Sequence, residues 1–436
     1  MTTSPQPPRA RYRGRPAAWL DRWGSIVPIL AAEFIVWLGF GALLPVLPLF
    51  LTEQGIDLAT LGLVIAAWPA ARLVGEPVFG WLADRTGRVP LMVVGLVATG
   101  IFSGLPLVLT GPVAFFVLRA AAGLSTALYD PAARGFLTDT TEPERRGEAF
   151  GLYGAAQMGG LLFGPAIGAF GAAFFGGHGF VFLFSAIASV AAAVAIALTA
   201  RERTAPGRTH PAPARDHVEF PHEGRGASDD WTADHAAPAR LWNRGLIAAL
   251  ILNAGGYFAT GAYEVIWSIF LDGLGAGLDL IGLTFAMFGL PILVLSPYAG
   301  RLVDRRGVLG FIVLGSIAPF VTGLAYTLIT NPLLAVPLIL IEATGFAFLN
   351  PALYSVVASS SPPGRSATAQ GLFGAAGTFG FIIGSLMAGS LAEIDIRYPF
   401  YVFAAVMLVS FVVAMAIGWQ VFRRPPPAPQ AAMAGL

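Results

Sequence analysis

The chain repeats one half of itself at an offset of 220 residues. The clearest copy is a charged loop between two apolar segments, where G-W-L-A-D-R-T-G at 80–87 matches G-R-L-V-D-R-R-G at 300–307. The offset persists outside this loop, since G-L-Y-G-A-A at 151–156 matches G-L-F-G-A-A at 371–376. Two copies of one unit rich in apolar spans predict two bundles related by a pseudo-symmetry axis, with a site where the bundles face each other.

Apolar residues make up 56% of the chain and charged residues only 12%, about half the charged share of a typical soluble domain. The apolar residues gather in runs long enough to cross a bilayer, which takes roughly 20 residues. Twelve such spans are predicted, at 26–51, 58–82, 90–110, 112–137, 147–172, 179–200, 243–271, 279–300, 309–329, 333–358, 366–391 and 398–422. The sequence therefore predicts an all-α membrane protein of twelve transmembrane helices in two pseudo-symmetric six-helix bundles.

The spans divide the chain into five parts. We expect an N-terminal segment at 1–25, a six-helix half at 26–200, a linker at 201–240, a second six-helix half at 241–422 and a disordered tail at 423–436. The linker is polar and rich in Pro, and it holds four of the five histidines, whose spacing matches no standard zinc pattern. This composition favours a flexible connection over a metal-sensing loop.

The positive charge of the chain is unevenly distributed. All 26 Lys and Arg positions are Arg. Most of them lie before the first span, in alternate loops or in the C-terminal tail: Arg9, Arg11, Arg13, Arg15, Arg22, Arg85, Arg88, Arg145, Arg146, Arg301, Arg305, Arg306, Arg365, Arg423 and Arg424. In the intervening loops only Arg397 breaks the pattern. Because positive charge is retained on the cytoplasmic side, both termini and the linker are predicted to be cytoplasmic.

Several classes of function are disfavoured by missing residue types. The chain has no Cys and no Lys, so thiol chemistry and a G-x-x-x-x-G-K-[ST] phosphate loop are excluded, and the chain alone is not expected to use ATP. No predicted span contains a His, which disfavours an intramembrane hydrolase or metalloenzyme. We therefore expect a protein that is not an enzyme and binds neither a metal nor a cofactor.

Short motifs carry a family resemblance. The loop at 80–88 resembles the signature loop of the major facilitator superfamily, and 300–307 resembles its weaker second copy. Arg119 followed by Gly123 resembles the helix-four motif of that superfamily. The segment G-F-G-A-L-L-P-V-L-P at 39–48 is similar to the helix-one motif of its twelve-span drug:proton antiporters.

A further motif lies in the fifth span. Gly160, Gly164, Pro165 and Gly168 form G-x-x-x-G-P-x-x-G, which resembles the helix-five motif of the superfamily's antiporters. The three glycines share one helix face and permit close approach of a neighbouring helix. Pro165 is expected to bend this helix, which favours a gating role over simple packing.

The resemblance implies a secondary active transporter, a proton-coupled efflux antiporter for small lipophilic or cationic organic compounds that works by alternating access. It implies a bacterial inner-membrane protein that acts as a monomer and uses the proton gradient as its energy source. The expected partners are a small-molecule substrate, protons and the lipid bilayer, and no nucleic acid.

The charged loop is predicted to latch the outward-open conformation. A carboxylate at Asp84 is attracted to the positive N-terminal end of another helix, and the resemblance implies the helix that begins near Ser366. Arg85 and Arg88 are predicted to pair with Asp139. The candidate gating residues are Gly80, Asp84, Arg85, Gly87, Arg88, Asp139, Asp304 and Arg305. The alternative is that these charges only solvate the loop and fix the topology.

Val308 and Ser359 stand at the positions that match Arg88 and Asp139 in the second copy. Neither side chain can form the ion pair, so the second latch is expected to be weaker.

Ionisable groups inside the spans are candidates for function because each costs roughly 2.5–3.5 kcal/mol on insertion scales. The candidates for proton coupling and substrate recognition are Glu33, Glu342, Glu264, Asp130, Arg119 and Asn253. A buried carboxylate favours its neutral form and a nearby Arg favours its charged form, so a carboxylate that changes surroundings can carry a proton. We place Glu33 and Glu342 first, with Arg119 as the group that tunes them. Interhelical hydrogen bonding alone is the alternative for each.

Two further expectations concern the partners of these groups. Arg72 and Glu76, spaced i, i+4, are expected to neutralise each other, and Arg119 is expected to be the intramembrane cation without a partner. Aromatic residues expected to line the cavity are Trp37, Tyr153, Tyr257, Trp267 and Phe373.

Two other functions remain open at this point. An uptake symporter or facilitator for a sugar or organic acid would use the same fold, but a sugar site needs several Asn and Gln side chains, and the candidate spans are poor in both. A non-transporting membrane sensor would be expected to lose the gating charges and buried carboxylates, which are present.

Overall fold

The computed structural model describes residues 23–141, 145–175, 177–200, 240–362 and 365–423. The helices of the first half are α2 (Val27–Leu43), α3 (Leu47–Glu53), α4 (Leu58–Thr86), α5 (Arg88–Gly104), α6 (Pro112–Thr140), α7 (Arg146–Phe175) and α8 (Gly179–Thr199). The second half holds α9 (Arg244–Gly273), α10 (Leu278–Arg306), α11 (Leu309–Tyr326), α12 (Ala335–Ser359), α13 (Ser366–Ala392) and α14 (Tyr398–Phe422). Short 3₁₀ turns at Leu105–Leu107 and Pro332–Leu334 precede α6 and α12. Among the described residues there is no strand.

Eleven of these helices are long and apolar enough to cross a membrane, or up to twelve if a bent pair counts as one span. The pair is α2 and α3, which meet at 41°. Pro45 and Pro48 lie at this break, and neither can donate a backbone hydrogen bond to continue the helix. The chain is a multi-pass membrane protein, and its helical architecture confirms the predicted fold class. Most of the expected N-terminal segment, of the linker and of the tail lies outside the described residues.

Side chains and glycines fix several helix ends. Asp57 caps α4 by accepting a hydrogen bond from the backbone N–H of Thr60 at 2.8 Å, and Asn243 caps α9 in the same way with Leu246 at 3.0 Å. The backbone N–H and hydroxyl of Thr60 both donate to Asp57 and hold the pKa of that carboxyl below its usual value. Gly87 and Gly307 end α4 and α10 with φ of 98° and 80°, a backbone conformation that favours glycine.

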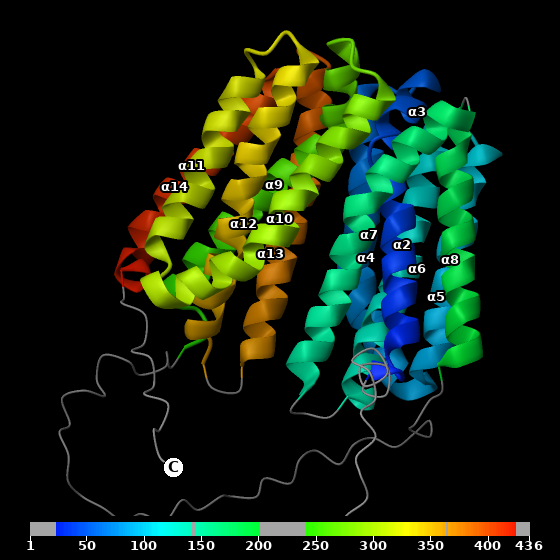
Figure 1. Ribbon diagram of the computed structural model, residues 1–436, viewed down its shortest axis with the longest axis horizontal. Helices are drawn as coiled ribbons and strands as arrows, with labels where there is room; N and C mark the ends of the chain where they lie inside the picture. The colour runs from blue at the N-terminus through cyan, green and yellow to red at the C-terminus, as the bar shows by residue number, and fades with distance from the viewer. Residues whose placement is uncertain (1–22, 142–144, 176, 201–239, 363–364, 424–436) are drawn as a thin grey trace, which may run out of the picture.

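The helices form two bundles, α2–α8 and α9–α14, which meet at one end of the molecule and diverge toward the other (Figure 1). A buried apolar cluster joins the bundles at the end where they meet, and it includes Leu51, Leu61, Trp267 and Leu271. We call this cluster the outer seal. Two other buried clusters are each confined to one bundle. Within the described part of the chain, a shared apolar core therefore joins the bundles at one end.

Glycines allow the closest approach between the two bundles. A Cβ at Gly62 of α4 would lie 2.5 Å from the carbonyl oxygen of Ser385 in α13, and a Cβ at Gly389 of α13 would lie 3.1 Å from Cα of Gly62. On the opposite side of the seal, a Cβ at Gly282 of α10 would lie 3.1 Å from the carbonyl oxygen of Pro165 in α7. Side chains at these glycines would push the bundles apart.

Candidate functional site

An ion pair crosses from one bundle to the other. Arg119 of α6 donates from Nη2 to Oε1 of Glu264 in α9 over 2.8 Å, and both side chains are about nine-tenths buried. The prediction that Arg119 has no partner is therefore wrong. The two residues are 145 positions apart in the sequence, and only the tertiary structure brings their side chains together.

The pair lies at the edge of the outer seal. Phe115, one turn before Arg119, and Val265, next to Glu264, both belong to the seal. The Nε of Arg119 is buried without a hydrogen-bond partner among the described residues. A buried ion pair of this kind costs about 3–5 kcal/mol to break when one partner is removed, because the other charge stays buried.

Arg72 organises a second group of charges inside the first bundle. Its Nη2 donates to Glu76 at 2.6 Å and also to Asp130 of α6. Arg134, one turn beyond Asp130, lies 3.5 Å from the same carboxylate. Arg72 and Glu76 do pair as expected, but Asp130 makes the pair part of a larger network that links α4 to α6.

Glu33 lies next to this network and is fully buried. Its carboxylate accepts hydrogen bonds from the indole of Trp37 and the hydroxyl of Tyr129, both at 2.9 Å, and from the amide of Gln157 at 3.3 Å. The hydroxyl of Tyr153 lies beside the same carboxylate. Glu33 therefore joins α2 to α6 and α7 through neutral donors. We call Glu33, Arg72, Glu76, Asp130 and Arg134 the N-half charge cluster.

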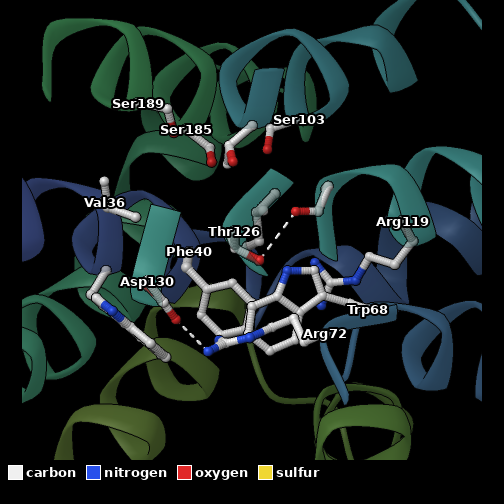
Figure 2. Close-up of a pocket in the computed structure, with 14 residues that line it drawn as sticks. Val36, Phe40, Trp68, Arg72, Ser103, Arg119, Thr126, Asp130, Ser185 and Ser189 are labelled. Atoms are coloured by element: carbon white, nitrogen blue, oxygen red, sulfur yellow. Dashed lines mark hydrogen bonds and ion pairs between the residues drawn. The ribbon is translucent and has the colours of Figure 1, made fainter. Parts of the chain in front are cut away.

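A pocket within the first bundle connects this cluster to the ion pair. Its lining residues are Val36, Trp37, Phe40, Leu43, Trp68, Arg72, Thr99, Ser103, Arg119, Ala122, Thr126, Asp130, Ser185 and Ser189. Figure 2 shows the guanidinium of Arg72 directed at Asp130, with Ser103, Ser185 and Ser189 gathered on the opposite side. The cavity volume open to water is about 30 Å³, room for about two water molecules.

Trp68 shapes this pocket from α4. The Arg72 guanidinium lies 4.6 Å from the centre of the Trp68 ring and the Arg119 guanidinium 5.9 Å from it. Cations over an indole face are attracted by its quadrupole, so Trp68 holds both arginines along one wall.

Glu342 occupies a different environment in the second bundle. It is fully buried and accepts a hydrogen bond from the hydroxyl of Tyr326 at 2.8 Å. Its Oε1 and the nearby hydroxyl of Tyr263 are buried without hydrogen-bond partners among the described residues. The surroundings are aromatic, since Trp267 and Phe400 both pack on Tyr326 and Tyr263. The structure pairs Glu342 with no cation among the described residues.

The position matching Glu33 in the second half is Asn253, which is buried and donates to the carbonyl oxygen of Phe373 at 2.7 Å. The aromatic residues predicted to line the cavity differ in their exposure. Trp267, Tyr153 and Phe373 are buried within the bundles, whereas Tyr257 is exposed. Trp267 is wrong as a cavity-lining residue because its indole packs into the outer seal and donates to Thr284 at 2.9 Å.

The charged loop forms one of its expected contacts. Nε of Arg88 lies 2.8 Å from Oδ2 of Asp139, which ties the start of α5 to the end of α6. Gly135 of α6 faces this arginine, and a Cβ there would overlap the Arg88 guanidinium. The guanidinium of Arg85, also predicted to pair with Asp139, instead stacks on the ring of Trp81, 3.8 Å from its centre.

The rest of the candidate gate is described in part. The side chains of Asp84, Asp304 and Ser366 lie outside what the structure describes. Arg305 is exposed in the last turn of α10, and a Cβ at Gly80 would lie 3.6 Å from Cβ of Pro131 in α6. Their role in a latch stays a prediction.

The glycines of the helix-five motif pack against α2. Cβ atoms at Gly160, Gly164 and Gly168 would overlap successive carbonyl oxygens of α2, those of Phe34, Leu38 and Ala42. In the second half Gly380 and Gly384 face Ala254 and Phe258 in the same register. α7 continues through Pro165 without a break in the helix. The motif therefore lets α7 lie directly on α2, while its Pro165 carbonyl faces α10 of the other bundle.

This packing yields a test of the motif. We expect Gly164→Leu to lower thermal stability and to reduce at least tenfold the export that the resemblance implies, because the side chain would force α2 and α7 apart. The measurement is transport in cells together with the melting temperature of the purified protein. Gly154→Leu, in the same helix but with open space around it, is the control and should stay close to wild type. Equal behaviour of the two variants would contradict close packing as the function of the motif.

Several residues at the site carried no recognisable signal in the sequence. Tyr129, Gln157 and Tyr326 were missed because hydroxyl and amide donors inside apolar spans follow no motif. Arg134 was missed because it lies in the last third of α6, near the predicted loop. Within the described residues, no three His, Cys, Asp or Glu side chains are grouped in a way that could hold a metal ion.

A family model described as Major Facilitator Superfamily matches residues 29–271 and 249–435. The chain belongs to this superfamily. The two matched segments cover both bundles, and they agree with the repeat that the sequence reveals at an offset of 220 residues.

Two curated relatives from Bacillus subtilis match most of this chain. It is 25% identical to Multidrug resistance protein 2 over 89% of its own length and 93% of that protein. It is 26% identical to Multidrug resistance protein 1 over 91% of its own length and 96% of that protein. Among solved structures, the nucleoside transporter NupG matches with a TM-score of 0.70 at 14% identity, over 90% of this chain and 98% of NupG. This structural similarity shows the shared fold alone.

Proposed function

We propose that this superfamily member is a secondary active transporter that exports small lipophilic or cationic organic compounds in exchange for protons. The observation that carries the proposal is the set of carboxylates buried in two different settings within the bundles. The multidrug resistance proteins that match about nine-tenths of the chain support the substrate class. The chemistry needs neither catalysis nor a bound cofactor, since the proton gradient supplies the energy.

Charge balance supports cation or proton recognition by the N-half charge cluster. Its three carboxylates, Glu33, Glu76 and Asp130, face only two guanidinium groups, those of Arg72 and Arg134. With all five groups ionised, the cluster carries one uncompensated negative charge. A proton on Glu33 or a substrate cation near the exposed part of the cluster would neutralise it, and one would then displace the other.

Glu342 is proposed as a second proton-carrying group. A buried carboxylate without a cationic partner is much more stable in its neutral form. Among the described residues, the polar groups next to Glu342 are the hydroxyls of Tyr326 and Tyr263. If water enters this aromatic region when the outer seal opens, the carboxylate can release its proton on that side. Tyr326 donates to Glu342 and also belongs to the outer seal, as do Trp267 and Phe400, which pack on Tyr326. Opening of the seal is thereby coupled to proton release.

The Arg119–Glu264 pair is proposed as the link between the bundles in the conformation described. It holds the sealed end closed while the opposite ends of the bundles diverge (Figure 1). The distribution of Arg supports a cytoplasmic location for the divergent end. On that orientation, in a bacterial inner membrane, the structure is in an inward-open conformation ready to accept a compound from the cell.

The two carboxylates can be tested by export from cells. We expect cells with the wild-type protein to expel ethidium, and a protonophore to stop this export. Glu33→Gln and Glu342→Gln should each reduce export at least tenfold, because a neutral amide can no longer exchange a proton. Glu148→Gln, an exposed position at the start of α7, is the control and should export normally. An export rate that is unchanged by the protonophore, at normal protein levels, would contradict proton coupling.

A further inference from the structure

One face of α9 points toward the first bundle. Glu264 lies on this face, because it reaches Arg119 of that bundle. Thr260 and Tyr257 precede Glu264 by four and seven residues, so they lie on the same face of the helix. Both are exposed, and Tyr257 is 44% exposed.

The exposure of Tyr257 is unusual for this helix. α9 packs against α12, α13 and α14 of its own bundle and against α3 and α4 of the other, and nearly all of its middle is buried. An exposed side chain on the face directed at the first bundle therefore lines the opening between the bundles, below the Arg119–Glu264 pair.

A second tyrosine lies beside it. Tyr354 of α12 is 52% exposed, and its ring centre lies 5.2 Å from that of the buried Phe373 in α13. Tyr257 packs on Gly377 of α13, where a Cβ would lie 3.0 Å from its ring. The two rings therefore come from different helices and are held in place from behind by α13. We call Tyr257 and Tyr354 the tyrosine wall.

The internal repeat shows how this wall differs from the one opposite. The positions that match the tyrosine wall at an offset of 220 residues are Trp37 and Arg134, of which Arg134 belongs to the N-half charge cluster. All five positions of that cluster are uncharged in the second half: Glu33, Arg72, Glu76, Asp130 and Arg134 match Asn253, Ile292, Ser296, Asn350 and Tyr354. The first bundle thus carries a charged cluster, partly exposed at Glu76 and Arg134, where the second bundle has an uncharged aromatic wall.

We propose that Tyr257 and Tyr354 bind the aromatic part of the substrate, while its charged part faces the N-half charge cluster. This inference rests on the proposed function and assigns the residues that select for ring-containing compounds. Tyrosine rings supply a large apolar contact area and attract both aromatic faces and adjacent cationic groups. An amphiphilic cation with a planar ring system fits this arrangement of two unlike walls.

The test is binding of ethidium, a planar aromatic monocation, to the purified full-length protein. We expect Tyr257→Leu and Tyr354→Leu each to raise the dissociation constant about tenfold, whereas Tyr257→Phe and Tyr354→Phe stay within about threefold of wild type. Tyr401→Leu replaces a similarly exposed tyrosine on α14, outside the opening, and should not change binding. If a leucine variant does not fold, methionine at the same position gives the same comparison.

Two results would overturn the proposal. Leucine variants that bind ethidium like wild type would show that the rings do not contact the substrate. Phenylalanine variants that lose as much affinity as the leucine variants would assign recognition to the hydroxyl groups instead of the rings. Failure of the wild-type protein to bind or export any organic cation would instead overturn the proposed function itself.

Discussion

Replacing Arg119 with methionine is expected to reduce transport at least a hundredfold. The substitution leaves Glu264 buried at the contact between the bundles without its only described partner. Removing one member of a buried ion pair costs about 3–5 kcal/mol, and about 1.4 kcal/mol corresponds to a factor of ten in an equilibrium. The conformation with the closed outer end would therefore no longer be lower in free energy than the conformations in which that end is open. The measurement is ethidium export at matched protein levels.

Three companion variants separate the pair from general damage. Arg119→Lys keeps the charge and should retain part of the activity. The double variant Arg119→Met with Glu264→Met removes both charges, so it should recover thermal stability but not transport. Arg306→Met removes an exposed arginine at the end of α10 and should have no effect. Full export by Arg119→Met would contradict the role of the pair in linking the bundles.

A single side chain at Gly389 is expected to open the outer seal. A Cβ at this position would overlap the carbonyl oxygen of Leu58 in α4 and lie 3.1 Å from Gly62, so Gly389→Val cannot keep α13 against α4. We expect the distance between the outer ends of the two bundles to increase by several ångströms and export to fall at least tenfold, because the protein can no longer close this end.

The absence of Cys from the chain makes this measurement direct. Cysteines introduced at Gln54 and Asp272, exposed positions next to the ends of α3 and α9, can be spin-labelled for distance measurement without removing native thiols. Gly371→Val lies on the same helix as Gly389 but has open space around it, and its distances should match those of wild type. An unchanged distance distribution in Gly389→Val would contradict the steric account of the seal.

The sequence predicts the helices well because a bilayer imposes a simple rule. Spans need roughly 20 apolar residues, and the predicted spans at 112–137 and 398–422 correspond closely to α6 at Pro112–Thr140 and α14 at Tyr398–Phe422. The repeat also anticipates packing, since glycines in the same register make the same backbone contacts in α7 and α13. Span length and repetition can be recognised in the sequence before the fold is known.

Charge partners could not be predicted in the same way. The expected pair of Arg88 and Asp139 came from a known motif and is present. Arg119 and Glu264 lie on helices from different bundles, and no pattern within either segment indicates that they meet. Asp130 was recognised as a candidate, but its link to Arg72 depends on how α4 lies against α6. Partner identity between distant helices is therefore a property of the tertiary structure.

Proton flux in vesicles tests the central claim most directly. The purified protein would be reconstituted into liposomes with an acidic lumen, and lumenal pH would be followed after ethidium is added outside. Exchange predicts that ethidium enters while protons leave, so lumenal pH rises in protein-containing vesicles faster than in empty ones. Ethidium accumulation with unchanged or falling lumenal pH would contradict antiport.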